Sequence, residues 1–138
     1  MNLINADLHC HSVVSDGTME PEALAARAKG NGVQLWALTD HDEIDGQRRA
    51  REAALAQGMD YLSGTEVSVS FAGVTVHIVG LGFNPDDAAL AAGLAATRTY
   101  PLRSSFRPSY NMAVNLVGQV GRAAAREALE TSFAQFQA

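Results

Sequence analysis

Cysteine, lysine and long apolar runs are the features that this 138-residue sequence has least of. The single cysteine, Cys10, cannot form an internal disulfide, which favours a reducing compartment and predicts a cytoplasmic location. No apolar run approaches the length of a transmembrane helix, about 18 residues. The first residues also lack the basic and apolar regions of a signal peptide. The sequence therefore predicts a globular chain without disulfides that does not associate with a membrane.

Charged residues are unevenly distributed along the chain. The net charge is −5, and the first 87 residues carry 13 acidic and 5 basic side chains, whereas the remaining residues carry five arginines and two glutamates. An acidic half that could hold cations, followed by an arginine-bearing half that could hold phosphate, is one interpretation. Ordinary surface variation is the other. With this acidic balance we expect no stable binding to DNA.

The pattern of apolar residues, glycines and prolines predicts strands that alternate with helices. Expected strands cover residues 3–11, 33–39, 61–71 and 74–83, the last two forming a hairpin, and expected helices cover 21–29, 47–57 and 85–97. This order favours parallel pairing with right-handed crossovers, hence an α/β barrel or an open α/β sheet. Residues 99–138 predict a divergent loop and a helical segment, so that we divide the chain into 1–98 and 99–138.

Histidine is also scarce, and its four copies all fall in or just after predicted strands. Alternation along the first strand places two of them on one face and Cys10 on the opposite face. In α/β folds, the C-terminal strand ends and the loops after them form the active-site face. Histidine and carboxylates together are the ligands of Zn²⁺, Mn²⁺ and Fe²⁺ sites. The pattern therefore predicts a metal site built from His9, His11, Asp16, His41, Glu66 and His77.

Four segments, "DLHCHSVVSDG", "LTDHD", "GTEVS" and "VHIVGLG", resemble in this order the PHP (polymerase and histidinol phosphatase) family, in particular its small bacterial phosphoesterases. The resemblance covers about residues 3–98. It implies part of a distorted (β/α)₇ barrel with up to three divalent ions, Mn²⁺, Zn²⁺ or Fe²⁺, at the C-terminal strand ends.

The same resemblance implies a role for each candidate residue. His9 and His11 would bind the first metal, Asp16 and His41 the second, while Glu66 would bridge the first and third metals and His77 would bind the third. Asp7 and Asp40 would orient ligand side chains. Asp42 would orient a ligand side chain or contact the substrate, and Arg98 would contact the substrate.

The implied reaction is hydrolysis of nucleotide phosphate esters by a metal-activated hydroxide, without a serine or cysteine nucleophile. The substrate would be a 3′,5′-bisphosphonucleotide, which loses one phosphate, or a short RNA cleaved stepwise from 5′ to 3′.

The chain departs from the family pattern after His77, because no later histidine is present to complete the metal cluster. We therefore expect a truncated relative whose catalysis is impaired, and self-association through an open sheet edge. Two further alternatives are an amidohydrolase-type hydrolase and a histidine-rich surface without metal. Many amidohydrolases bridge their metals with a carboxylated lysine, and the only lysine here, Lys29, falls in a predicted helix.

Overall fold

The computed structural model describes residues 4–71 and 74–99. In these ranges the chain forms strands β1 (Ala6–Asp7), β2 (Leu35–Leu38), β3 (Asp60–Phe71) and β4 (Val74–Leu81), and helices α1 (Pro21–Gly30), α2 (Gln47–Ala56) and α3 (Ala88–Thr99). The predicted element order and the hairpin are confirmed. The loop and helix expected over 99–138 lie outside the described residues, apart from the last residue of α3, and the division of the chain at residue 98 stays a prediction.

The first strand is much shorter than the expected 3–11. Only Ala6 and Asp7 pair with β2, at the edge of the described sheet. The chain comes back into the same alignment with the segment of β2 at Cys10. The carbonyl oxygen of Cys10 accepts a hydrogen bond from the backbone nitrogen of Thr39 at 2.9 Å. The chain therefore stays beside β2 up to this point, although its histidines stand on a loop rather than on a regular strand.

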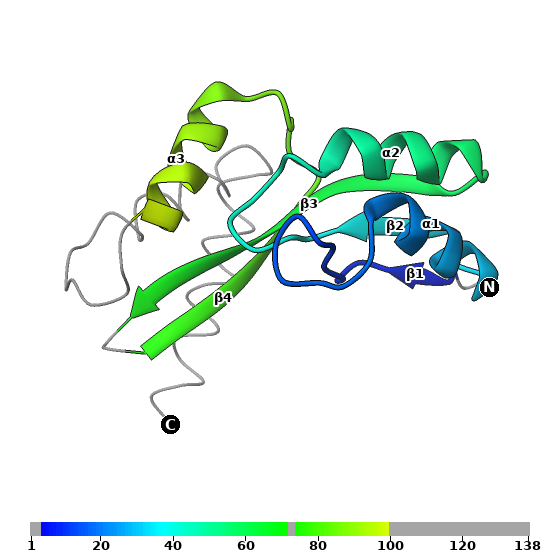
Figure 1. Ribbon diagram of the computed structural model, residues 1–138, viewed down its shortest axis with the longest axis horizontal. Coiled ribbons are helices and arrows are strands. Elements are labelled where there is room, and N and C mark those ends of the chain that lie inside the picture. Colours follow the sequence, from blue (N-terminus) through cyan, green and yellow to red (C-terminus); the bar gives the residue numbers. More distant parts are fainter. Residues whose placement is uncertain (1–3, 72–73, 100–138) are drawn as a thin grey trace.

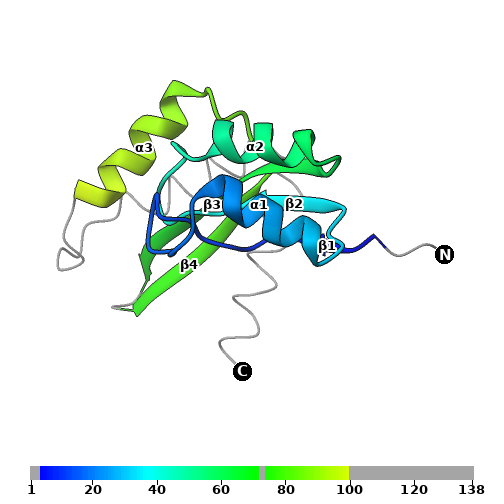
Figure 2. The same ribbon diagram turned by 45° about the vertical axis from the view of Figure 1, so that its right-hand side comes forward.

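The described strands form one sheet in the order β1-β2-β3-β4. The first three strands are parallel, and β4 runs antiparallel to β3. Helices α1 and α2 pack against each other on one face of this sheet, and α3 packs against β3 (Figures 1 and 2). The result is the expected partial α/β barrel, about half closed.

The core between α1, α2 and the sheet forms around β2. This strand is buried on both faces, and Trp36 and Leu38 have no exposed surface. The Trp36 ring packs against that of Tyr61, with centroids 5.7 Å apart. Small residues on the helices let them approach the strand closely; the buried cluster is Ala25, Ala28, Val33, Trp36, Leu38, Ala50, Ala54 and Met59.

Helix α3 begins at Ala88, three residues later than the expected start at residue 85. The Asp87 carboxylate accepts hydrogen bonds from the backbone nitrogens of Ala89 (2.8 Å) and Leu90 (3.0 Å), which makes Asp87 the N-cap. Asn84 instead closes the preceding turn, with its side chain accepting from the nitrogen of Asp86. Of the polar residues in the segment 84–87, Asp87 is therefore the one that caps α3, and the helix starts directly after it.

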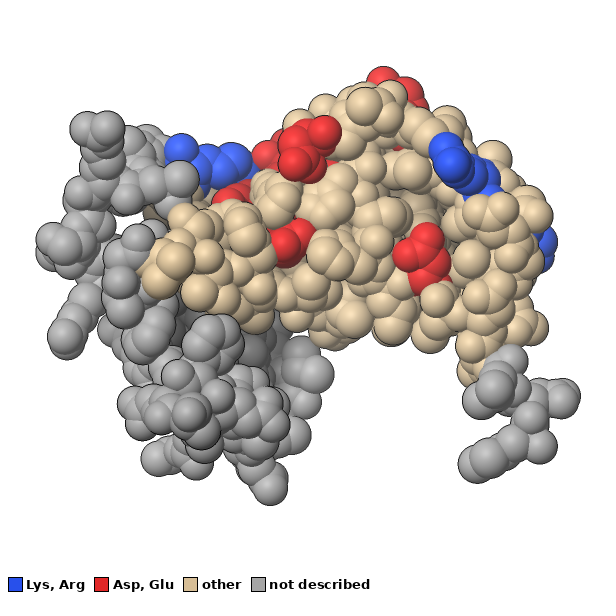
Figure 3. Space-filling view, turned by 90° about the horizontal axis from the view of Figure 1, so that it is seen from below, with Lys and Arg blue, Asp and Glu red and all other residues tan. Residues whose placement is uncertain are grey.

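The molecule seen from below carries a broad uncharged surface, with acidic side chains in its central part and lysine or arginine nearer its two ends (Figure 3). On the described part of this face, the basic side chains form no continuous track of the kind that follows a nucleic-acid backbone. The expectation that the protein does not bind DNA stably stays a prediction. None of the helices in the described ranges combines the length and the apolar character needed to cross a lipid bilayer.

Candidate metal centre

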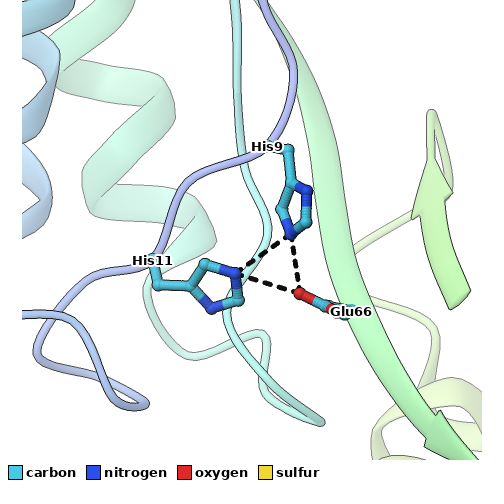
Figure 4. Close-up of side chains that lie close together, drawn as sticks. All are labelled: His9, His11 and Glu66. Atoms are coloured by element: carbon cyan, nitrogen blue, oxygen red, sulfur yellow. Dashed lines mark hydrogen bonds and ion pairs between the residues drawn. The ribbon is translucent and has the colours of Figure 1, made fainter. Parts of the chain in front are cut away.

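The C-terminal end of the parallel sheet brings His9, His11 and Glu66 together (Figure 4). His9 Nε2 lies 2.7 Å and His11 Nε2 lies 3.0 Å from Oε2 of Glu66, and the two imidazole nitrogens are 3.1 Å apart. The histidines come from the loop after β1, and the glutamate comes from β3. The expectation that both imidazoles point to the same side of the chain is confirmed.

Two further groups of ligand-type side chains adjoin the first. His11 Nδ1 lies 3.3 Å from Asp16, and His41 Nε2 lies 3.7 Å from the same carboxylate. His41 also lies 3.9 Å from Glu66, and His77 Nδ1 lies 3.6 Å from it. In each group the candidate ligand atoms all lie within 4.8 Å of one another; the groups are His9–His11–Glu66, His11–Asp16–His41 and His41–Glu66–His77.

The arrangement suits divalent cations better than it suits a packed polar core. Nδ1 of His41 is buried and has no hydrogen-bond partner in the described part of the chain, and Nδ1 of His11, also buried, has only the Asp16 carboxylate at ion-pair distance. Buried polar atoms without partners are costly, and coordination to a cation would satisfy such atoms. Two ligand atoms on a tetrahedral zinc ion lie about 3.4 Å apart, and the ligand-type pairs here are separated by 2.7 to 3.9 Å. The residues present therefore fit divalent ions.

Glu66 is the carboxylate shared by the first and third groups. It is 6% exposed, and burial alone would raise the pKa of its carboxyl group. The hydrogen bond with His9 and the nearby imidazoles of His41 and His11 outweigh burial and hold this pKa below its ordinary value. Glu66 is thus kept ionised, as a bridging metal ligand must be.

Gly17 allows Asp16 to return beside His11. A Cβ atom at position 17 would lie 2.1 Å from the carbonyl oxygen of His11, so no other residue fits without a backbone shift. The turn is closed by hydrogen bonds from the nitrogens of Ser15 and Gly17 to the carbonyl oxygen of Ser12, at 3.1 and 2.8 Å. This tight return places two ligand candidates five residues apart in contact.

The residues predicted to orient ligands differ in what they contact. Asp40 is buried and hydrogen-bonded to the loop that follows His11. Asp7 lies 3.5 Å from the backbone nitrogen of His9, and in the described ranges its carboxylate makes no hydrogen bond to an imidazole. The expected contact between Asp7 and a ligand ring is therefore not seen.

The residues predicted to contact the substrate have protein partners. Asp42 is 8% exposed and adopts a positive φ of 50°, and its carboxylate accepts a hydrogen bond from the nitrogen of Ser68 at 2.8 Å. Arg98, on α3, pairs with Glu43 at 2.8 Å and donates to the carbonyl oxygen of Asp42 at 2.5 Å. Both side chains therefore fasten the loop after His41, and their contact with a substrate stays a prediction.

Ser12 and Ser15, whose hydroxyl groups donate hydrogen bonds to the Asp40 carboxylate, were not among the residues predicted from the sequence. The signal was their position between two ligand candidates in "HSVVSD", where short polar side chains often bond to a neighbouring loop. Ser68, whose hydroxyl lies 3.4 Å from Nδ1 of His77, was not predicted either. Cys10 donates to the carbonyl oxygen of Ala37 at 3.5 Å and packs against the core, on the side away from the imidazoles, as expected.

The family model for the PHP domain matches residues 7–133, and the chain belongs to this family. Among curated relatives, a 3′,5′-nucleoside bisphosphate phosphatase of Chromobacterium violaceum is 49% identical over 96 residues, which cover 70% of this chain and 34% of that protein. A 5′-3′ exoribonuclease of Haemophilus influenzae is 46% identical over 78 residues, covering 56% and 28% respectively. The chain thus spans about a third of the length of these relatives.

A relative of another class is the probable helicase HelY of Mycobacterium tuberculosis, which is 66% identical over 47 residues, covering 34% of this chain and 5% of the helicase. Two solved structures resemble the fold. One, described as an amidohydrolase of Chromobacterium violaceum with bound sulfate and no metal, has a TM-score of 0.67 and 49% identity, covering 69% of this chain and 34% of that one. The other, provisionally named a metal-dependent phosphoesterase of Bifidobacterium adolescentis, has a TM-score of 0.66 and 32% identity, covering 86% and 40%.

Proposed function

We propose that the protein is a metal-dependent phosphoesterase that removes a phosphate from nucleotides, with 3′,5′-bisphosphonucleotides as the first substrate class to test. The observation that carries the proposal is the set of three adjoining ligand groups, which share His11, His41 and Glu66. A site with shared ligands suits neighbouring cations, which is the arrangement that phosphoryl transfer uses. The relative named as a bisphosphate phosphatase supports the choice of substrate.

The candidate ligands can be assigned to individual ions. Each neutral imidazole donates one lone pair and would bind one ion, whereas the Glu66 carboxylate can bridge two. His9 and His11 would hold the first ion, Asp16 and His41 the second, and His77 the third, with Glu66 shared by the first and third. Bound divalent ions, Mn²⁺, Zn²⁺ or Fe²⁺, would supply Lewis acidity that activates water and offsets charge on the phosphoryl oxygens. The lowered pKa of Glu66 keeps its carboxylate ionised, so that it can attract the surrounding imidazoles and bind cations.

Cys10, the only thiol, does not act as a nucleophile in this proposal. Its side chain points to Ala37 and away from the cluster, and burial, with the nearby charge of Asp7, raises the pKa of the thiol to about 11. Thiolate is therefore scarce at neutral pH. The same free cysteine supports a cytoplasmic location for the protein.

A short RNA cleaved from its 5′ end is the second substrate class, supported by the relative named as an exoribonuclease. Cleavage of a phosphodiester needs the same ions and the same ligands. An amidohydrolase reaction is less well supported, because Lys29 lies exposed on α1 while a glutamate occupies the shared position in the cluster.

Metal analysis after dialysis and phosphate release from a 3′,5′-bisphosphonucleotide test the proposal. No histidine follows His77 among the 138 residues, so these four imidazoles are all that the cluster can use here, and we expect weak binding of divalent metal and slow release of phosphate. Glu66→Gln should abolish both signals, while Glu52→Gln, which alters an exposed ion pair with Arg48 on α2, should change neither. Release of ammonia from an amide substrate, with no release of phosphate, would overturn the proposal in favour of an amidohydrolase.

A further inference from the structure

Asp40 contacts the first ligand-bearing loop through its side chain. It is 1% exposed and directly precedes His41. Its Oδ1 accepts hydrogen bonds from the backbone nitrogen of Ser12 (2.6 Å) and the hydroxyl of Ser15 (2.7 Å), and its Oδ2 accepts one from the hydroxyl of Ser12 (2.7 Å). The two serines directly adjoin the ligand candidates His11 and Asp16.

The backbone of Asp40 contacts the strand that carries the shared glutamate. Its carbonyl oxygen accepts hydrogen bonds from the backbone nitrogen of Glu66 and from the hydroxyl of Thr65, both at 3.1 Å. One buried residue therefore touches the loop of His11 and Asp16, adjoins His41 in the chain, and bonds to the backbone of Glu66. Each of the three ligand groups includes at least one residue that this position helps to hold.

The partners of the Asp40 carboxylate are all neutral donors. Within residues 4–71 and 74–99, no arginine, lysine or histidine forms an ion pair with it. A buried carboxylate without a cation is unfavourable unless charge elsewhere offsets it. Asparagine could accept the two bonds made to Oδ1, but its NH₂ group could not accept the bond that the Ser12 hydroxyl donates to Oδ2, so this hydroxyl would have to turn and accept instead. A carboxylate satisfies all three donors as they stand, and cations held in the adjoining cluster would offset its charge.

We propose that Asp40 is a positioning residue for the metal centre: it locks the loop 12–16 to the segment 39–41 and so sets the spacing of His11, Asp16 and His41. This inference rests on the proposed metal centre, but not on the nature of the substrate. Its main effect falls on the second ligand group, because the Asp16 carboxylate is 68% exposed and relies on its loop for placement.

Ser15 tests the contact from the loop side: its hydroxyl donates to Asp40 at 2.7 Å and lies at a longer 3.5 Å from Oδ1 of Asp16, and its removal breaks no backbone–backbone hydrogen bond. Outer partners of metal ligands are typically worth about 10–100-fold in metal affinity. Ser15→Ala should weaken the binding of one Mn²⁺ ion by about tenfold, and Ser15→Thr, which keeps the hydroxyl, should restore it. Asp40→Asn should lose that ion altogether. Ser63→Ala removes a hydroxyl that bonds to the carbonyl oxygen of Phe83, and it serves as the matched control with unchanged Mn²⁺ binding.

The measurements are calorimetric titration with Mn²⁺, metal per chain after dialysis, and urea unfolding of each metal-free variant. Weaker binding of one Mn²⁺ ion, by about tenfold, in Ser15→Ala but not in Ser15→Thr, at equal urea midpoints, supports the role of Asp40. Equal binding in Ser15→Ala, Asp40→Asn and the unsubstituted protein would overturn it, and so would equal weakening in both Ser15 variants or in Ser63→Ala. If the unsubstituted protein releases no phosphate while Ser15→Ala still binds that ion more weakly, the proposed function fails and the role of Asp40 stands.

Discussion

Nε2 of His9 lies 2.7 Å from Oε2 of Glu66, although 57 residues separate them in the chain. Cys10 is next to His9 but faces Ala37 on the other side of the segment. His9→Ala should therefore lower metal affinity by more than the about 10–100-fold that outer partners of ligands are worth, whereas Cys10→Ser should leave it nearly unchanged. Metal analysis after dialysis measures both. Equal losses in the two variants would show that the cysteine, too, faces the ions.

Gly17→Ala should damage the metal centre by moving the loop. The new methyl group would have to fit 2.1 Å from the carbonyl oxygen of His11, so the loop must shift, at a cost of about 1–3 kcal/mol in the free energy of unfolding. Bound metal should fall as well, since Asp16 moves with the loop. Gly30→Ala at the end of α1 is the control: nothing lies within 4 Å of its added Cβ, and stability should change by less than about 1 kcal/mol. Urea unfolding and metal titration compare the two, and a Gly17→Ala protein as stable as Gly30→Ala would contradict the geometry.

Alkylation of Cys10 should be slow at neutral pH. Burial, with the charge of Asp7, raises the pKa of the thiol to about 11, so at pH 8 only about 0.1% of it is thiolate. Iodoacetamide should react on the order of 100-fold faster with the protein unfolded in urea than with the folded protein, as followed by mass spectrometry.

The thiol also affects stability at alkaline pH. Because its folded pKa lies above the unfolded value, its contribution to stability is complete below the unfolded pKa and is lost as the pH rises through about 11. Cys10→Ser should flatten this part of the stability curve. Rapid alkylation of the folded protein at pH 8 would contradict both the burial of the Cys10 thiol and its raised pKa.

We predict that the chain self-associates through β4. Val74 and Val76 are 62% and 41% exposed on this strand, which pairs only with β3 among the described strands. Open strand edges and exposed apolar residues both favour association. Val76→Lys should reduce the mass measured by light scattering toward that of a monomer, while Leu55→Lys, at an exposed position on α2, should not. A monodisperse monomer of the unsubstituted protein would contradict this prediction.

Much of the fold follows from local patterns. The apolar run around Trp36 and the helix-forming residues 47–57 reflect backbone preferences and side-chain periodicity, which act over a few residues, and the elements appear where these patterns predict them. The exact ends are less local. The first strand ends at Asp7, where its pairing with β2 ends, and α3 begins after Asp87 because a helix starts at the side chain that caps it.

The six candidate ligands could be proposed from the sequence because metal chemistry restricts residue types, and for His9, His11, Asp16 and His41 because the loops after parallel strands gather at one edge of the sheet. Their partners could not be predicted in this way. Whether a buried carboxylate such as Asp40 meets a hydroxyl, or an arginine such as Arg98 meets a carboxylate, depends on which loops lie beside one another.

The sequence by itself determined the order of the elements, the set of metal-binding residue types and the PHP family of this protein, because each of these is written in residue identity and short-range spacing. Only the tertiary structure decided that Glu66 lies between His9, His41 and His77, that Gly17 turns Asp16 back to His11, and that Asp40 joins their loops. The physical reason is distance along the chain. Contacts between residues tens of positions apart depend on how the strands pair and how the core packs, and no local preference specifies either.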